Sequence, residues 1–331
     1  MSQLSICIPT YNRAEYLPML LDSIIKQVKD HKLVEICISD NASTDNTKEL
    51  INEYKKKYKN IKYYCSPNNM GVERNFLKVI DIAAGKYCWL MGSDDCLMDN
   101  SVLYILEKIA QHDVDIILSD VRYLASKSMK KMKKIFQCST RSKYEEIFDL
   151  AKEADYVRYA ASATSTDAFF GYMGNIIVKK ASWNKVKLDK AALGSSYIQV
   201  YMLLSMIHIN CCKMLVTLRP ISIYRLYNDC FSKNGLAARI LIDIKGYHLI
   251  GNLLFKNDFV RYVGLMHALQ KEMEKLFFSM KRRASLNILA DKESRKFLYY
   301  SCEFLFKKSF HKMHLRVLDV LCAFPPIKSL L

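Results

Sequence analysis

Two adjacent carboxylates, Asp94 and Asp95, follow a short apolar stretch at residues 87–91. The stretch lies between Gly85 and Gly92, a pattern typical of a buried strand. Neighbouring negative charges repel each other, so such a pair is favoured where a cation neutralises it. Carboxylate oxygens are the preferred ligands of Mg²⁺ and Mn²⁺, which also bind phosphates. The pair therefore indicates a site for a metal and a nucleotide, although a solvated acidic loop would carry the same residues.

The residues around this pair alternate between strand and helix patterns. Apolar stretches predict strands, and apolar residues at helical spacing predict the helices between them. The predicted strands cover residues 4–8, 34–39, 61–65, 87–91 and 114–119, and the helices 14–27, the stretch up to about 58, and 72–84. This alternation indicates an α/β fold with a mostly parallel sheet and helices on both faces.

Polar residues follow several of these strands directly. Asp40, Asn68 and the pair Asp94 and Asp95 each come after a predicted strand. Ligands bind open α/β sheets in the crevice at the carboxyl ends of the strands. We therefore expect these side chains to lie in one crevice.

The sequence beyond residue 120 shows weaker patterns. We predict a strand over 169–178, a helix over 197–209, and two strands within 214–224 that are broken at Pro220. From about residue 236 onward the pattern is helical. The chain therefore divides into three parts, residues 1–120, 121–235 and 236–331.

The positive charge is concentrated in the later parts of the chain. The net charge is +17 over 331 residues, but residues 1–120 are slightly acidic. A basic excess of this size predicts an anionic partner, such as phosphates, nucleic acid or a membrane surface. Residues 126–143 hold seven Lys and Arg and no acid, which predicts a solvated loop or, alternatively, a lid or a lipid-phosphate contact.

Several sequence features bear on the cell compartment. No apolar run reaches the roughly 18 residues of a transmembrane helix, and the first residues lack the basic flank of a signal peptide. Several of the 11 cysteines, such as Cys7 and Cys88, lie inside predicted strands. This placement indicates buried thiols in a reducing cytosol rather than a disulfide framework.

The motifs in the first third are similar to those of a known enzyme family. In order, they are ICIPTYNR at 6–13, ISDNASTD at 38–45, Asn69-Met70-Gly71 with Arg74-Asn75, and the stretch from Gly85 to the acid pair. Together they resemble the family 2 glycosyltransferases of GT-A fold. More narrowly, they resemble bacterial O-antigen sugar transferases of the abequosyltransferase type.

The resemblance implies roles for individual residues. It implies that nucleotide binding involves Pro9, Thr10, Tyr11, Arg13, Asp40, Asn69, Arg74, Asn75, Asp94 and Arg225. Within this set, Asp40 would accept a hydrogen bond from the base, and Arg225 would lie near the diphosphate. Asp95 would bind the metal ion, Mg²⁺ or Mn²⁺, directly, with Asp94 nearer the ribose or the sugar.

The chain departs from the family pattern in two places. A His that completes metal binding often follows the position of Arg225, but residues 227–229 read Tyr-Asn-Asp. A Glu-Asp pair usually provides the catalytic base, but residues 194–199 hold no carboxylate. Asp167 and Asp189 are the nearest acids, and we favour Asp167 as the base on position alone. Alternatively, no protein carboxylate takes the proton.

The resemblance implies an inverting glycosyltransferase. Its donor would be a nucleotide-diphosphate sugar, and its acceptor a polyprenyl-diphosphate-linked oligosaccharide in O-antigen or other surface polysaccharide synthesis. It would be cytoplasmic and peripheral on the inner face of the cytoplasmic membrane, where residues 121–235 bind the acceptor and residues 236–331 contact anionic lipid.

Two other functions compete with this interpretation. A nucleotidyltransferase acting on a sugar phosphate also uses a metal-held acidic pair, but it usually needs a Gly-rich loop after the first strand. Residues 9–13 contain no glycine. A nucleic-acid-binding protein would fit the total charge. However, the acidic first third would repel a polyanion, so we expect no nucleic acid as a partner.

Overall fold

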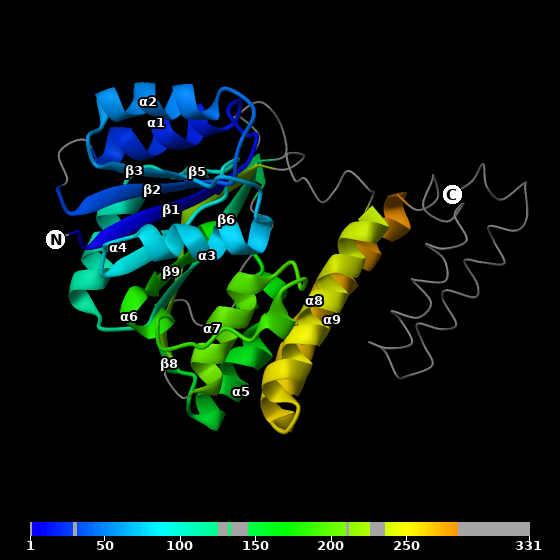
Figure 1. Ribbon diagram of the computed structural model, residues 1–331. Coiled ribbons are helices and arrows are strands. Elements are labelled where there is room, and N and C mark those ends of the chain that lie inside the picture. The colour runs from blue at the N-terminus through cyan, green and yellow to red at the C-terminus, as the bar shows by residue number, and fades with distance from the viewer. Residues whose placement is uncertain are drawn as a thin grey trace, which may run out of the picture.

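The computed structural model describes residues 2–28, 32–124, 132–133, 145–209, 212–225 and 236–283. Most of the basic segment 126–143, residues 227–229 and the chain beyond 283 lie outside these residues. A single mixed sheet crosses the molecule, and helices cover both of its faces (Figure 1). This arrangement agrees with the α/β class predicted from the sequence.

The first part of the chain forms four parallel strands in the order β3-β2-β1-β4. The strands are β1 (Leu4–Thr10), β2 (Val34–Asp40), β3 (Ile61–Cys65) and β4 (Tyr87–Leu90). The helices between them are α1 (Leu17–Val28), α2 (Thr47–Lys57) and α3 (Val72–Ile82). The predicted elements of residues 4–91 are therefore confirmed, with ends that differ by a few residues.

The second part of the sheet is mixed. The remaining strands are β5 (Cys96–Leu97), β6 (Ile116–Leu124), β7 (Met132–Lys133), β8 (Glu146–Asp149), β9 (Ile176–Lys179) and β10 (Lys213–Arg225). Strand β9 lies antiparallel between β4 and β6, whereas β10 pairs parallel with β6. Strands β5 and β8 pair antiparallel with β10, and β7 pairs antiparallel with β6. The expectation of a mostly parallel sheet thus applies to the first four strands, whereas the later strands pair in both directions.

Two predicted strands differ from the structure. The strand expected over 169–178 begins only at Ile176, because two 3₁₀ turns, Thr166–Phe169 and Met173–Asn175, precede it. Phe170, between these turns, has a left-handed φ of 69°, which ends any extended run. The two strands expected within 214–224 are a single strand, β10. Its register shifts between Thr217 and Ser222, which places Pro220 in a bulge where its missing N–H is tolerated.

Alternating side chains of the strands bury two hydrophobic layers. Ile6 and Ile8 face one layer, which contains α1, α2 and α4 (Ser101–Gln111). Cys7 faces the other layer, as expected for a period of two residues. This second layer contains α3, α5 (Glu153–Ser162), α6 (Lys180–Trp183) and α7 (Ile198–His208).

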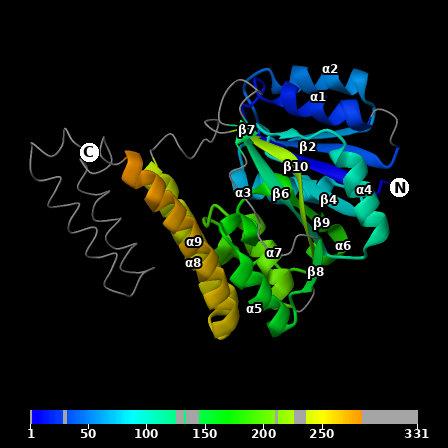
Figure 2. The ribbon, with the colours of Figure 1, turned by 180° about the vertical axis from the view of Figure 1, so that it is seen from behind.

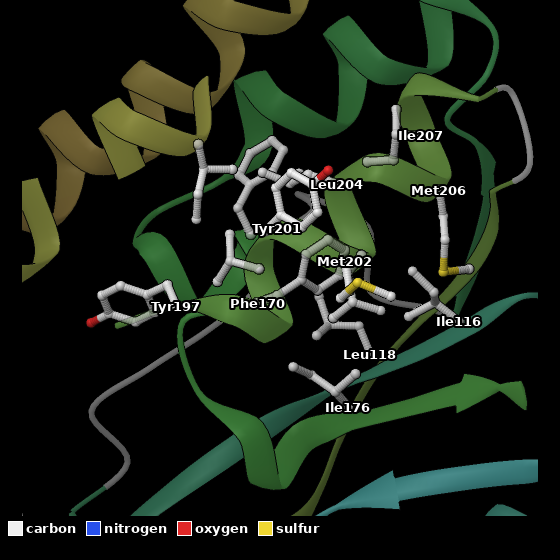
Figure 3. Packing of buried hydrophobic residues seen from close by; sticks show 14 of the residues in the cluster. Ile116, Leu118, Phe170, Ile176, Tyr197, Tyr201, Met202, Leu204, Met206 and Ile207 are labelled. Atoms are coloured by element: carbon white, nitrogen blue, oxygen red, sulfur yellow. The ribbon is translucent and has the colours of Figure 1, made fainter. Parts of the chain in front are cut away.

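Helix α7 is apolar along nearly its whole length and is buried against the sheet. Figure 3 shows Met202 and Met206 of α7 over Ile116 and Leu118 of β6, with Ile176 of β9 beside them. Because α7 is buried in this way, its first turn has a defined place next to the sheet.

Two long helices, α8 (Leu236–Phe255) and α9 (Phe259–Arg283), follow the sheet. They pack side by side, and α9 also packs against α5 (Figures 1 and 2). The helical pattern predicted from residue 236 is therefore confirmed as far as residue 283. Among the described residues, no helix has the length and apolar character needed to cross a membrane.

Candidate active site

The loops that follow β1, β2 and β4 meet at the carboxyl edge of the sheet. Thr10 at the end of β1 is paired in register with Asp40 at the end of β2. On the other side of β1, the N–H of Met91 donates to the Cys7 carbonyl (2.9 Å). Arg13, from the loop after β1, lies with Nη1 3.5 Å from Oδ2 of Asp94. The loops therefore meet at one edge of the sheet, as expected, and we refer to the place where they meet as the crevice.

Asp95 is buried at this edge and is fixed by two hydrogen bonds. The Tyr172 hydroxyl donates to Oδ2 (3.0 Å), and the backbone N–H of Arg225 donates to Oδ1 (3.3 Å). A Cβ atom at Gly92 would lie 2.7 Å from Oδ2, so the carboxylate fits only beside a glycine. Burial, together with the negative charge of Asp94, raises the pKa of Asp95 well above its usual range. A cation bound here would offset both the burial of the Asp95 charge and its repulsion by Asp94.

Two guanidinium groups lie beside the acid pair. The guanidinium of Arg225 donates through Nε to the backbone carbonyl of Asp94 and through Nη2 to the carbonyl of Tyr16 (3.3 Å). The Tyr16 ring lies 5.1 Å from the guanidinium carbon of Arg13 and 5.6 Å from that of Arg225. Tyr16 therefore links the two arginines, and the crevice holds two positive charges next to two carboxylates.

Asp40 is buried at the end of β2, and both of its oxygens have donors. The backbone N–H of Ser43 donates to Oδ1 (2.9 Å), and the Tyr63 hydroxyl donates to Oδ2 (2.6 Å). Burial and this hydrogen bond raise the pKa of Tyr63, which keeps the phenol protonated as a donor. Each carboxylate oxygen has a further lone pair, so Asp40 can still accept a hydrogen bond from a nucleobase.

A third group of polar side chains joins the loops after β2 and β3. The Asn75 amide donates to the Thr10 carbonyl (3.1 Å) and accepts from the Ser39 hydroxyl (2.7 Å), so it ties the ends of β1 and β2 together. Asn69 accepts from the Asn41 amide (2.7 Å). Arg74, in the first turn of α3, is exposed. Its guanidinium is therefore accessible to a ligand at this edge.

The loops after β1 and β2 are bonded directly to each other. The backbone N–H of Asn12 donates to the Ser43 hydroxyl (2.8 Å), and the N–H of Thr44 donates to Oδ1 of Asn12 (2.8 Å). The carboxylate of Asp45 accepts from the N–H of Ala14 (2.9 Å). These bonds hold the two loops as one wall of the crevice.

The first-strand motif lines this wall with exposed and buried groups. Pro9 is half-buried at the end of β1, and Tyr11 is 42% exposed. The hydroxyl of Thr10 is buried and has no hydrogen-bond partner among the described residues. A buried hydroxyl without a partner is costly, and a ligand oxygen could satisfy it.

The sequence motifs predict Tyr11 but miss three other tyrosines of the site. Tyr16 lies just before α1, Tyr63 in β3 and Tyr172 between two 3₁₀ turns. Each lies in an ordinary apolar pattern, so nothing local distinguishes it from a core residue. These tyrosines could have been identified only from their position opposite the end of a strand. That position is known only when the order of the strands in the sheet is known.

The structure places the two candidate bases differently. Asp167 lies in the 3₁₀ turn Thr166–Phe169, in the segment that leads to Tyr172. Asp167 lies near Tyr247 of α8. Burial is the main cause of the raised pKa of Tyr247, and the nearby groups Tyr197, Asp167 and Asp243 raise it further. Asp189 is exposed and accepts from the N–H of Ala191 (2.9 Å), which is a capping role.

The acid pair offers ligands suited to Mg²⁺ or Mn²⁺. Both cations prefer carboxylate oxygens, and the raised pKa of Asp95 indicates a site that a positive charge would stabilise. The described part of the chain contains no group of three or more His, Cys, Asp or Glu residues that could hold a metal ion.

The sequence profile of glycosyl transferase family 2 matches residues 5–172. This match covers the loops after β1, β2 and β4, and it ends at Tyr172, before Arg225. The chain belongs to glycosyl transferase family 2. An abequosyltransferase of Salmonella typhimurium is 35% identical over 278 residues, which are 84% of this chain and 83% of that protein. A glucosyltransferase of Campylobacter jejuni, named for its action on GalNAc(5)-diNAcBac-PP-undecaprenol, is 32% identical over 109 residues, 33% of this chain and 35% of that protein.

Solved structures with a similar fold agree with the described architecture. A crystal structure of S. aureus TarS superposes with a TM-score of 0.61 at 16% identity, covering 92% of this chain and 80% of that chain. A mannosyltransferase of Pyrobaculum calidifontis, solved with GDP-Man and Mn²⁺, gives a TM-score of 0.54 at 11% identity, covering 99% and 86%. At these identities the likeness shows the fold alone. The expected GT-A fold with a helical C-terminal region is thereby confirmed.

Proposed function

We propose that this glycosyltransferase moves a sugar, with inversion, from a nucleotide-diphosphate sugar to a lipid-diphosphate-linked oligosaccharide in surface polysaccharide synthesis. The observation that carries the proposal is the crevice at the ends of β1, β2 and β4, where Asp94 and Asp95 meet Arg13 and Arg225. The Salmonella and Campylobacter relatives support a sugar donor and a lipid-linked acceptor.

In the proposed reaction the anomeric C–O bond to the diphosphate breaks, and negative charge develops on the departing phosphate oxygens. The guanidiniums of Arg13 and Arg225 lie at the acid pair, where they can stabilise this charge as it forms. Because both arginines are held against Tyr16, they need little reorganisation during the reaction. The crevice wall that ends in Asp40 would orient the nucleobase.

Asp95, with Asp94 beside it, would hold Mg²⁺ or Mn²⁺ in this proposal. The ion would supply further positive charge to the diphosphate. Tyr172 and the N–H of Arg225 fix the orientation of the Asp95 carboxylate through one hydrogen bond to each oxygen. Removal of the ion should therefore weaken nucleotide binding without disturbing the fold.

The acceptor hydroxyl would attack the sugar from the face opposite the diphosphate and lose its proton to a base. Asp167 is our candidate, because its turn leads directly to Tyr172 at the acid pair. The acceptor would then lie between the segment at 165–175 and the first turn of α7. The basic C-terminal region would hold the enzyme on the inner face of the cytoplasmic membrane, near its lipid-linked acceptor.

Thermal unfolding with a panel of nucleotides tests the donor side of this proposal. UDP, CDP, GDP and dTDP are each added with Mn²⁺ or with a chelator. A specific nucleotide at about a hundred times its Kd stabilises the native state by about 2.7 kcal/mol. We expect one nucleoside diphosphate to raise the melting temperature, and to do so more strongly with Mn²⁺. No stabilisation by any member of the panel would contradict the proposal.

A further inference from the structure

The turn that precedes α7 is held by a carboxylate from a distant part of the chain. Glu73, in the first turn of α3, accepts hydrogen bonds from the backbone N–H groups of Gly194 (2.6 Å) and Ser196 (2.9 Å). It also accepts one from the Ser195 hydroxyl (3.2 Å). Residues 194–199 carry no acid of their own, so the structure brings one to this turn from α3.

The backbone of the turn explains why it needs an anion. Gly194 and Ser196 both have left-handed conformations, with φ values of 97° and 64°. Serine adopts this conformation only where the surroundings impose it. In such turns the N–H groups point into a shared concave site that binds an anion. Glu73 lies at that site and accepts from both N–H groups, so its carboxylate stabilises this conformation.

Glu73 is adjacent to the nucleotide side of the crevice. Asn75, two residues further along α3, bonds the Thr10 carbonyl and the Ser39 hydroxyl at the ends of β1 and β2. Arg74 is exposed at the same end of the helix. A displacement of the first turn of α3 would therefore move Glu73 together with groups of the nucleotide site.

The turn connects in the other direction to the helical part of the molecule. Tyr197, at the start of α7 (Figure 3), donates a hydrogen bond through its hydroxyl to Asp243 of α8. Its ring packs edge-on against Tyr247 at a centroid distance of 5.2 Å. Both residues of α8 are buried. The turn is thus the point where the nucleotide side, α7 and α8 meet.

We propose that Glu73 is a positioning residue that couples the nucleotide site to the turn at 194–196 and so places the acceptor side of the enzyme against the donor sugar. This inference rests on the proposed function, because it assumes that the acceptor binds in the 121–235 half. Three donors already engage the two oxygens of Glu73. Its role is therefore to hold the turn rather than to take the proton of the acceptor.

Hydrogen exchange tests the coupling without any assay of activity. In Glu73→Gln the side-chain amide presents N–H groups to backbone donors, so the hydrogen bonds to the turn cannot all form. We expect the amides of Gly194 and Ser196 to exchange about tenfold faster or more in this variant. In the wild type, the nucleoside diphosphate of the panel that binds best should slow these amides further. In Glu73→Gln the same nucleotide should bind but leave them unchanged.

Asp81→Asn provides a matched control at the other end of α3. The Asp81 carboxylate pairs with Lys78 on the helix surface (2.8 Å), so its loss should not change exchange at the turn. Unchanged exchange at Gly194 and Ser196 in Glu73→Gln would overturn the inference. An equal nucleotide effect on these amides in the wild type and the variant would also overturn it.

Steady-state kinetics supplies the second readout. A positioning role predicts that Glu73→Gln lowers kcat for sugar transfer about tenfold or more, since small displacements of reacting groups are costly. The donor KM should change less than about twofold. An unchanged kcat, or a parallel loss of donor binding, would overturn the inference. If the wild type transfers no sugar, the proposed function fails, and the exchange experiment alone decides the role of Glu73.

Discussion

At the residue scale, the site depends on side chains that hold one another in place. Asp95 has a donor on each oxygen, from Tyr172 and Arg225, and Asp40 has donors from Ser43 and Tyr63. A carboxylate fixed in this way is preorganised, so little free energy is lost in orienting it when a ligand binds. A side chain at Gly92 would displace the Asp95 carboxylate, because its Cβ atom would lie 2.7 Å from Oδ2.

The first prediction concerns the base. If Asp167 takes the proton of the acceptor, Asp167→Asn should lower kcat by about a hundred- to ten-thousandfold. Nucleotide binding should be unchanged, because Asp167 is not among the residues expected to bind the nucleotide. Single-turnover assays with the lipid-linked acceptor, together with nucleotide titrations, measure both quantities.

Asp189→Asn is the control for this experiment, since that carboxylate caps a 3₁₀ turn on the surface. A loss of less than about threefold in Asp167→Asn would remove Asp167 from the reaction. The same small loss in both variants would favour proton transfer without a protein carboxylate.

At the element scale, the crevice is built by loops that are tied together before any ligand binds. Asp45 is central to this arrangement, because it joins the loop after β1 to the start of α2. Its carboxylate accepts from the N–H of Ala14 (2.9 Å), from the N–H of Thr47 (3.1 Å) and from the Thr47 hydroxyl (2.5 Å). Burial opposes the charge on Asp45, but these hydrogen bonds outweigh it and lower the pKa of the carboxyl.

The second prediction follows from this lowered pKa. At neutral pH, Asp45→Asn should lower the free energy of unfolding by about 1 kcal/mol, the usual net contribution of one hydrogen bond, because the amide cannot accept from all three donors. A folded pKa below the unfolded one gives stability that is present above the unfolded value and lost as pH falls through the folded value. The difference between wild type and variant should therefore shrink below about pH 4.

Urea titrations at several pH values measure this difference. Asp99→Asn is a suitable control, because Asp99 is an exposed residue paired with Lys26 on the surface (2.6 Å). A difference between wild type and Asp45→Asn that grows as pH falls would contradict the account.

The parts of the fold that could be predicted are those whose pattern lies within one short stretch of sequence. The strands β1 to β4 and their helices show clear periodicity, and the acid pair follows a strand that glycines mark on both sides. The antiparallel insertion of β9 could not be predicted, because its short apolar run fits a strand in either direction. The contacts of Tyr63, Tyr172 and Glu73 join residues 23, 77 and 121 positions apart. Such contacts depend on the strand order and not on any local pattern.

At the scale of the whole molecule, the charge is distributed unevenly between the nucleotide side and the C-terminal region. The loops after β1, β2 and β4 lie in a slightly acidic first third, and the positive excess lies beyond it. Such an arrangement suits an enzyme that approaches an anionic membrane with its later part. The helices α8 and α9 pack against α7 and α5, so these two helices have a fixed place relative to the sheet.

The third prediction tests the proposed membrane contact. Charge reversal of Lys281, Arg282 and Arg283, at the end of α9, should weaken binding to anionic vesicles by about 1 kcal/mol per charge. Co-sedimentation with phosphatidylserine-containing vesicles at low and high salt measures the bound fraction. The control variant reverses Lys55, Lys56 and Lys57 at the end of α2. It changes the net charge by the same amount, but on another face of the molecule (Figure 1). An equal loss of binding in both triple variants would contradict a specific contact by α9.

The central claim is that the buried carboxylate at the end of β4 supports sugar transfer. Asp95→Asn tests it most directly, because the amide keeps the shape of the side chain and removes the charge that a metal ion needs. Transfer from the donor selected by the nucleotide panel should fall at least about a hundredfold. The melting temperature without ligand should not fall, since a buried like-charge repulsion is removed. Transfer by Asp95→Asn at close to the wild-type rate would contradict the account.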